Sequence, residues 1–293
     1  GYCDATQPDP DRFVVNAPLY SLLIAPVEFV LPLSLRAVKV ATLLFGVLGL
    51  GILYALIHRL LGKSRALAAT ILVAFNPAIL LFSTEALSEA PFIALVLLIF
   101  YLVEKVAESD GKRPFMALVI SVAAVGLLRE AGIAVVLAVC VYYLSMRQWK
   151  RALMLGASSL LVLAMWYLRN KGYAGLSPGG ATTNLSLVAQ HLVTPPDASL
   201  VNELILRAWL SLKSYTFQIG GLLFNPLGSS QLSDLIVGPF PVYRAVKSGL
   251  NTIGPVVALG TLSVILAGIV ADFRTSPTAI VRGAFGACYC AAI

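Results

Sequence analysis

Two carboxylates spaced four residues apart are the first groups in this sequence that could perform chemistry. They are Glu85 and Glu89, in the segment Ser83-Thr-Glu85-Ala-Leu-Ser-Glu89. On a regular helix that begins near Ser83, both carboxylates would lie on one face, about one turn apart. Such a pair could bind a divalent cation (Mg²⁺ or Mn²⁺), bind a cationic group or share a proton. The alternative is helix capping, with Ser83 or Thr84 as the N-cap and the acidic residues stabilised by the helix dipole.

Two arginines lie where apolar runs of the chain end. Arg129 and Glu130 form the polar turn between two such runs. The planar guanidinium of Arg129 is suited to a phosphate; alternatively, Arg129 and Glu130 form a local ion pair that anchors the turn. Arg169 follows Trp166 and precedes Asn170. It is either a second phosphate ligand or part of the aromatic and basic belt that membrane interfaces favour.

The polar N-terminal segment and a later polar segment hold the remaining candidates. Weak candidates for a catalytic carboxylate are Asp4, Asp9 and Asp11. Asn16 and Tyr20 follow them and could contact a sugar or a phosphate, whereas a solvated loop is the alternative for this whole segment. His191 is a further candidate for a metal or phosphate contact, and with Glu85 and Glu89 it completes the predicted metal ligands.

The elements that must position these side chains are membrane helices. The chain has 293 residues, of which 59% are hydrophobic and 12% charged, against about 45–50% and about 25% in soluble domains. The apolar runs are continuous rather than alternating, which disfavours a transmembrane barrel. The net charge of +7 is typical of cytoplasmic loops rich in lysine and arginine, and we expect no nucleic acid partner. The sequence therefore predicts an all-α, polytopic transmembrane protein.

The apolar runs divide what we expect to be a single membrane domain, residues 1–293. We predict an extracytoplasmic loop and an interfacial helix in 1–35, six transmembrane helices in 36–169, a long extracytoplasmic loop with an interfacial helix in 170–251, and further transmembrane helices in 252–293. The runs behind the six helices are 37–58, 66–83, 90–103, 114–128, 131–146 and 152–168.

The charges of the connecting loops predict the orientation of these helices. The basic loops carry Arg59, Lys63 and Arg65; Lys105, Lys112 and Arg113; and Arg147, Lys150 and Arg151. Short basic loops stay in the cytoplasm. The turns at 84–89 and 129–130, together with the N-terminal polar segment, are therefore expected on the extracytoplasmic side.

In their order along the chain, these segments resemble the membrane-embedded glycosyltransferases of the GT-C fold. The resemblance is closer to the branch that includes protein O-mannosyltransferases and the lipid A aminoarabinose transferase. Asn16-Ala-Pro18-Leu-Tyr20 resembles the Pro-Pro-Leu-Tyr segment of that branch, and Phe75-Asn-Pro77 with Ser83 to Glu89 resembles its Asn-Pro with Ser-x-Glu-x-x-x-Glu. Leu128-Arg-Glu-Ala-Gly132 resembles its Thr-Arg-Pro-x-Gly, and Trp166-Tyr-Leu-Arg169-Asn170 resembles its Pro-Trp-x-x-Arg-Asn. The likeness covers about residues 1–175, and it departs from the branch at Glu130, where proline is usual.

The resemblance implies an inverting transfer of a sugar from a polyprenyl-phosphate carrier to a lipid, glycan or protein acceptor. The reaction would take place on the extracytoplasmic side of a bacterial or archaeal plasma membrane. In that branch the catalytic carboxylate lies well before the Pro-Leu-Tyr segment, so we expect it upstream of Gly1. The residues that would contact the donor phosphate or sugar are Asn16, Tyr20, Glu85, Glu89, Arg129, Glu130 and Arg169. The alternatives are an enzyme similar to GPI mannosyltransferase II and a secondary transporter or lipid flippase.

Overall fold

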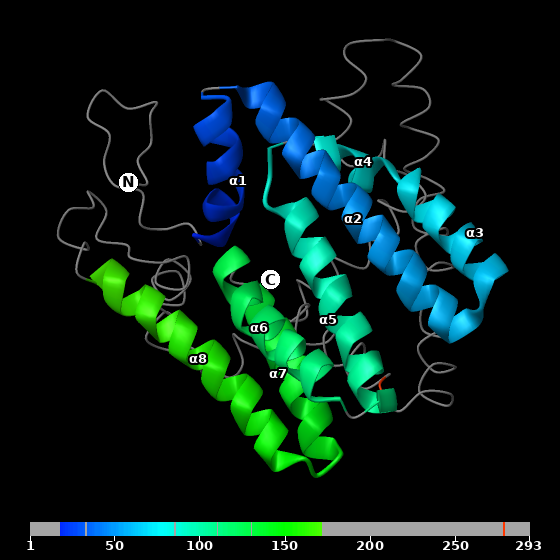
Figure 1. Ribbon diagram of the computed structural model, residues 1–293, viewed down its shortest axis with the longest axis vertical. Helices are drawn as coiled ribbons and strands as arrows, with labels where there is room; N and C mark the ends of the chain where they lie inside the picture. The colour runs from blue at the N-terminus through cyan, green and yellow to red at the C-terminus, as the bar shows by residue number, and fades with distance from the viewer. Residues whose placement is uncertain are drawn as a thin grey trace, which may run out of the picture.

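The part of the chain that can be described is entirely helical (Figure 1). The computed structural model describes residues 18–32, 34–84, 86–109, 111–129 and 131–171, together with Thr278. No strand occurs among these residues, which confirms the all-α prediction. The predicted loop and helices of 172–293, apart from Thr278, lie outside them.

Eight helices make up the described residues, and three of them are long and apolar enough to cross a membrane. They are α1 (Leu19–Val30), α2 (Leu35–Leu61), α3 (Lys63–Ala74), α4 (Pro77–Thr84), α5 (Glu89–Ser109), α6 (Lys112–Leu128), α7 (Gly132–Ser145) and α8 (Trp149–Lys171). The candidate spans are α2, α5 and α8, which agrees with the predicted membrane protein. The number of spans in 36–169 stays a prediction.

The connections between helices fall into two groups at opposite ends of the bundle. In Figure 1, the basic connections α2–α3, α5–α6 and α7–α8 lie towards the lower end, whereas α4–α5 and α6–α7 lie towards the upper end. This grouping matches the one predicted from loop charge. The assignment of the lower end to the cytoplasm stays a prediction.

The buried core lies between α5, α6, α7 and α8. Among its most buried side chains are Ile99, Leu118, Val135 and Leu155, each 0% exposed. By contrast, α2 exposes many large apolar side chains along its length, such as Leu44 at 63%. In water such a surface would be an aggregation hazard, whereas in a bilayer it is the surface that lipid covers.

The apolar run at 66–83 forms two helices rather than one. The helix α3 ends at Ala74 and α4 begins at Pro77. Between them, Asn76 caps α4, because its side-chain Oδ1 accepts a hydrogen bond from the backbone N–H of Ile79 at 3.4 Å. Asparagine is a favoured N-cap and proline a favoured first helical residue. The segment Phe75-Asn-Pro77 is therefore a break between two helices.

The prediction of one regular helix beginning near Ser83 is wrong. Ser83 and Thr84 belong to the last turn of α4, and α5 begins at Glu89. The reason is Pro91, which has no N–H and would clash with a preceding carbonyl inside a helix, but is tolerated in the first turn. Ser83 and Thr84 therefore do not cap the long helix, and residues 86–88, between α4 and α5, are not helical.

Candidate functional site

The candidate site lies where α5 begins and α6 ends. Glu89 is the first residue of α5, and Arg129 directly follows α6 in an extended conformation, with φ −152° and ψ 146°. The guanidinium Nη1 of Arg129 donates to Oε1 of Glu89, and the two side chains form an ion pair. The structure thus brings together two residues that the sequence had placed on the same side. Among the described residues, Glu89 is the ion-pair partner of Arg129. The neighbouring Glu130 lies outside them, so the predicted pair of Arg129 with Glu130 stays a prediction.

The turn that presents Arg129 requires a glycine. The backbone N–H of Arg129 donates to the carbonyl of Val125 at 3.2 Å, and that of Gly132 donates to the carbonyl of Arg129 at 2.9 Å. A Cβ atom on Gly132 would lie 2.5 Å from the Val125 oxygen and 2.9 Å from the backbone nitrogen of Gly126. Both are backbone atoms that cannot rotate away. Only glycine therefore lets α7 begin so close to the end of α6.

The side chain of Arg129 is partly shielded but remains accessible. It is 38% exposed and that of Glu89 is 25% exposed. The guanidinium carbon also lies 6.0 Å from the ring centroid of Phe92, within the range of a cation–π contact. A guanidinium carries five N–H donors in one plane. It can therefore bind an oxyanion while it stays paired with a carboxylate.

A cavity of about 390 Å³ opens at the same end of the bundle, beside Tyr20. Its walls come from α1, α2 and the link before α5, and the lining residues are Tyr20, Ser21, Ile24, Glu28, Ser34, Leu35, Val38 and Ala86. The hydroxyl of Tyr20 lies 3.2 Å from that of the fully buried Thr42. Tyr20 also packs against the buried core. This predicted residue therefore has a fixed place at the cavity wall.

Sequence reasoning did not single out Glu28 or Thr42. Glu28 lines the cavity and is exposed. It was detectable as the only acidic residue in the apolar stretch from Pro18 to Pro32. Thr42 gave no such signal, because threonine is common in membrane helices. Its relevance comes from the contact of its hydroxyl with that of Tyr20 in α1.

Arg169 is not part of this arrangement. Its guanidinium carbon lies 4.6 Å from the ring centroid of Trp166, one turn earlier on α8. In Figure 1 the C-terminal end of α8 and the start of α5 lie well apart. These contacts favour the interfacial belt over a shared phosphate site.

Several predicted site residues have no described side chain. Outside the described residues, or without a described side chain, are Asp4, Asp9, Asp11, Asn16, Glu85, Glu130, Asn170 and His191. In the part that is described, no group of three or more His, Cys, Asp or Glu side chains could hold a metal ion. Of the predicted metal ligands only Glu89 is described, and it is paired with Arg129.

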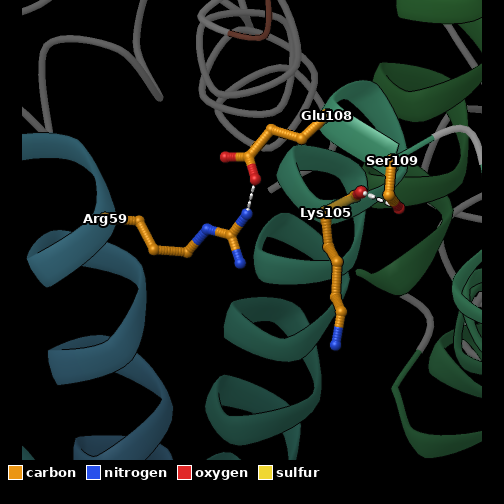
Figure 2. A network of polar contacts seen from close by, with 4 residues as sticks. All are labelled: Arg59, Lys105, Glu108 and Ser109. Atoms are coloured by element: carbon orange, nitrogen blue, oxygen red, sulfur yellow. Dashed lines mark hydrogen bonds and ion pairs between the residues drawn. The ribbon is translucent and has the colours of Figure 1, made fainter.

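A second ion pair holds the other end of α5 (Figure 2). Arg59, near the end of α2, pairs with Glu108, near the end of α5. Its guanidinium carbon also lies 5.4 Å from the ring centroid of Tyr101. The nearby hydroxyl of Ser109 donates to the Lys105 carbonyl at 2.8 Å, within α5 itself. Each end of α5 thus forms an ion pair with an arginine that also lies over an aromatic ring.

The comparisons with known proteins give one result for this chain. A family model described as dolichyl-phosphate-mannose-protein mannosyltransferase matches residues 15–168, which is more than half of the chain. The match includes Tyr20, Glu89 and Arg129 and stops just before Arg169. The searches of curated proteins and of solved structures found no match.

Proposed function

Because the chain belongs to the dolichyl-phosphate-mannose-protein mannosyltransferase family, we propose that it transfers a sugar from a polyprenyl-phosphate carrier to an extracytoplasmic acceptor. The family consists of membrane glycosyltransferases, and the three long apolar helices agree with a membrane location. The proposed donor sugar is a hexose, and the proposed setting is a bacterial or archaeal plasma membrane. The proposed acceptor is a lipid, a glycan or a protein.

The observation that carries this proposal is the ion pair of Arg129 with Glu89 at the end opposite the basic loops. A polyprenyl donor keeps its tail in the bilayer, so its phosphate must lie at a membrane surface. When the sugar leaves, negative charge grows on that phosphate, and a fixed guanidinium stabilises it. In this role Glu89 and the ring of Phe92 hold the guanidinium of Arg129 in position.

The cavity beside Tyr20 is the proposed place for the sugar. Its volume of about 390 Å³ falls within the range of about 300–1,000 Å³ that small-molecule sites occupy. The carboxylate of Glu28 and the hydroxyls of Tyr20 and Ser21 at its wall are groups that bind sugar hydroxyls. The helix α1, which carries them, packs against α6, whose end presents Arg129.

The proposed reaction inverts the configuration of the sugar. An acceptor hydroxyl attacks the anomeric carbon opposite the phosphate, the bond from that carbon to the phosphate oxygen breaks, and a carboxylate takes the hydroxyl proton. We assign this role to no described residue. The divalent cation stays a prediction, and no step of the proposed reaction passes through it. Addition of EDTA to the transfer assay tests whether the reaction needs such a cation.

The two arginines that fasten α5 provide a matched test of this proposal. In the full-length protein, Arg129→Ala should lower transfer from a radiolabelled polyprenyl-phosphate sugar by about 10²–10³-fold, the loss typical of one oxyanion donor. Arg129→Lys should not restore it, since lysine lacks the planar fork. Arg59→Ala removes the equivalent ion pair and ring contact at the other end of α5, and it should leave transfer within a few fold.

Equal losses of activity in the Arg129→Ala and Arg59→Ala variants would contradict the proposal, because both arginines would then only stabilise the position of α5. The transporter or flippase alternative predicts substrate movement without transfer, and it also expects ionisable groups near the bilayer midplane. The pair of Arg129 with Glu89 lies instead at a helix end. Together with the family match, this favours the enzyme.

A further inference from the structure

A basic hollow lies at the α7–α8 connection, at the opposite end of the bundle from Arg129 (Figure 1). It has a volume of about 470 Å³ and is lined by Arg147, Gln148, Trp149, Lys150 and Arg151. Three of these residues are basic and none is acidic. The hollow is therefore suited to an anion, and nothing in the proposed transfer reaction uses it.

Arg147 occupies a backbone conformation that glycine normally takes. Its φ of 57° is the only positive φ of a non-glycine residue in the described part of the chain. Here α7 ends, as the N–H of Arg147 donates to the Leu144 carbonyl at 2.9 Å and that of Gln148 to the Tyr143 carbonyl at 2.8 Å. Glycine is the usual residue at such a helix end. An arginine at a strained position is an observation that points to a role for its side chain.

The hollow is also partly organised before any ligand arrives. The Nη1 of Arg151 donates to the side-chain oxygen of Gln148 at 2.9 Å, and its guanidinium carbon lies 5.2 Å from the centroid of the Phe115 ring. These contacts hold Arg151 against the protein. Arg147 and Lys150, in contrast, are exposed at the rim of the hollow.

An exposed apolar stripe on α8 begins at the hollow. Trp149 is 65% exposed, and Leu153 and Leu160 on the same helix face are 72% and 69% exposed. Tryptophan is enriched where the apolar part of a membrane meets the headgroups. A site with a basic hollow at one end and an apolar stripe leading away from it has the two chemical parts of a phospholipid.

We propose that this surface binds an anionic phospholipid, with its phosphate headgroup in the hollow and an acyl chain along Trp149, Leu153 and Leu160. Basic pockets at the ends of membrane helices are suited to acidic headgroups. The inference does not depend on the proposed transferase activity, because it concerns the other end of the bundle and other side chains.

Titration of the delipidated full chain with phosphatidylglycerol or phosphatidylcholine, followed by native mass spectrometry, tests this site. The protein should retain one phosphatidylglycerol with higher affinity than phosphatidylcholine. The double variant Arg147→Gly with Lys150→Gln should lower the phosphatidylglycerol affinity by about 30-fold, because each basic residue near an acidic headgroup contributes about fivefold to the affinity. Its melting temperature should not fall, since glycine relieves the left-handed backbone at position 147.

The matched control is Lys63→Gln with Arg65→Gln. These two residues are exposed at the start of α3, directly after α2, and the change in charge is the same. This control should keep its phosphatidylglycerol affinity within about threefold of the unmodified protein, since its charges lie outside the hollow. Equal affinity losses in both double variants, or equal binding of the two lipids by the unmodified protein, would overturn the proposal.

Discussion

Arg129 and Arg59 make the same two kinds of contact at opposite ends of α5. Each pairs with a glutamate of that helix and covers an aromatic ring. What distinguishes Arg129 is its setting, at the end of the bundle that carries the cavity beside Tyr20. At the scale of residues, the question is therefore whether the charge of Arg129 serves Glu89 alone or also a substrate.

Removing both charges of the Arg129–Glu89 pair answers that question. Either Arg129→Gln or Glu89→Gln alone leaves a charge without its partner. Because both side chains are partly exposed, each change should lower the free energy of unfolding by about 0.5–1 kcal/mol. The double variant removes both charges and should recover most of that stability. Under the proposed function its transfer activity stays low, because the phosphate ligand is still missing. Recovery of activity together with stability would show that Arg129 is an anchor.

The sequence placed Glu89 and Arg129 on one side of the membrane, but it could not pair them. Loop charges and the parity of spans are enough to group the turns, since both depend only on composition and order. The pairing depends on the tight turn at Gly132 and on the side-chain conformations of both residues. Glu28 was detectable in the sequence as an isolated acidic residue, but its place at a cavity wall depends on the packing of α1 against α2.

At the scale of elements, the link between α6 and α7 carries the strongest geometric constraint near the site. Gly132→Ala would push a Cβ atom against the Val125 carbonyl and should move Arg129 away from Glu89. We expect a lower melting temperature in detergent, equivalent to about 1–3 kcal/mol of overpacking, and a loss of transfer activity. Gly51→Ala is the matched control, since a Cβ at Gly51 meets nothing within 4 Å and alanine favours the helix. A Gly132→Ala variant with normal stability and activity would refute this account of the turn.

Two helix boundaries had signals in the sequence. The start of α5 was nevertheless predicted wrongly, and the break between α3 and α4 was not predicted. Pro91 restricts the start of α5 to the residues just before it, and the pair Asn76-Pro77 is a capping signal inside an apolar run. Hydrophobicity alone merges such segments because it does not register a missing N–H. Where a run was free of these signals, as in α7 and α8, the predicted and observed helices agree closely.

At the scale of the whole molecule, composition alone was sufficient to predict an all-α membrane protein, because no soluble core could hide so much apolar surface. The sidedness of the bundle is the part that still needs a measurement. In a cysteine-free background, Ser64→Cys at the start of α3 should react with an impermeant thiol reagent only after the cells are permeabilised. Leu87→Cys, in the link before α5, should react in intact cells.

Both test positions are exposed, so accessibility should reflect the side of the membrane rather than burial. Labelling of Ser64→Cys in intact cells would reverse the orientation and remove the proposed extracytoplasmic site. The lipid-binding inference would stand unchanged, since its titration does not depend on sidedness.

The two fastenings of α5 also limit how the protein can adjust to membranes of different thickness. Glu89 and Glu108 lie about 28 Å apart along the helix axis, close to the thickness of about 30 Å of a hydrocarbon layer. Both carry charges that favour the aqueous surfaces, so the distance between them sets the hydrocarbon thickness that α5 matches. The helix α2 has 27 residues and is about 40 Å long. It is paired with α5 through Arg59 and is longer than the charged span of α5. In a thin membrane we therefore expect α2 to tilt more than α5.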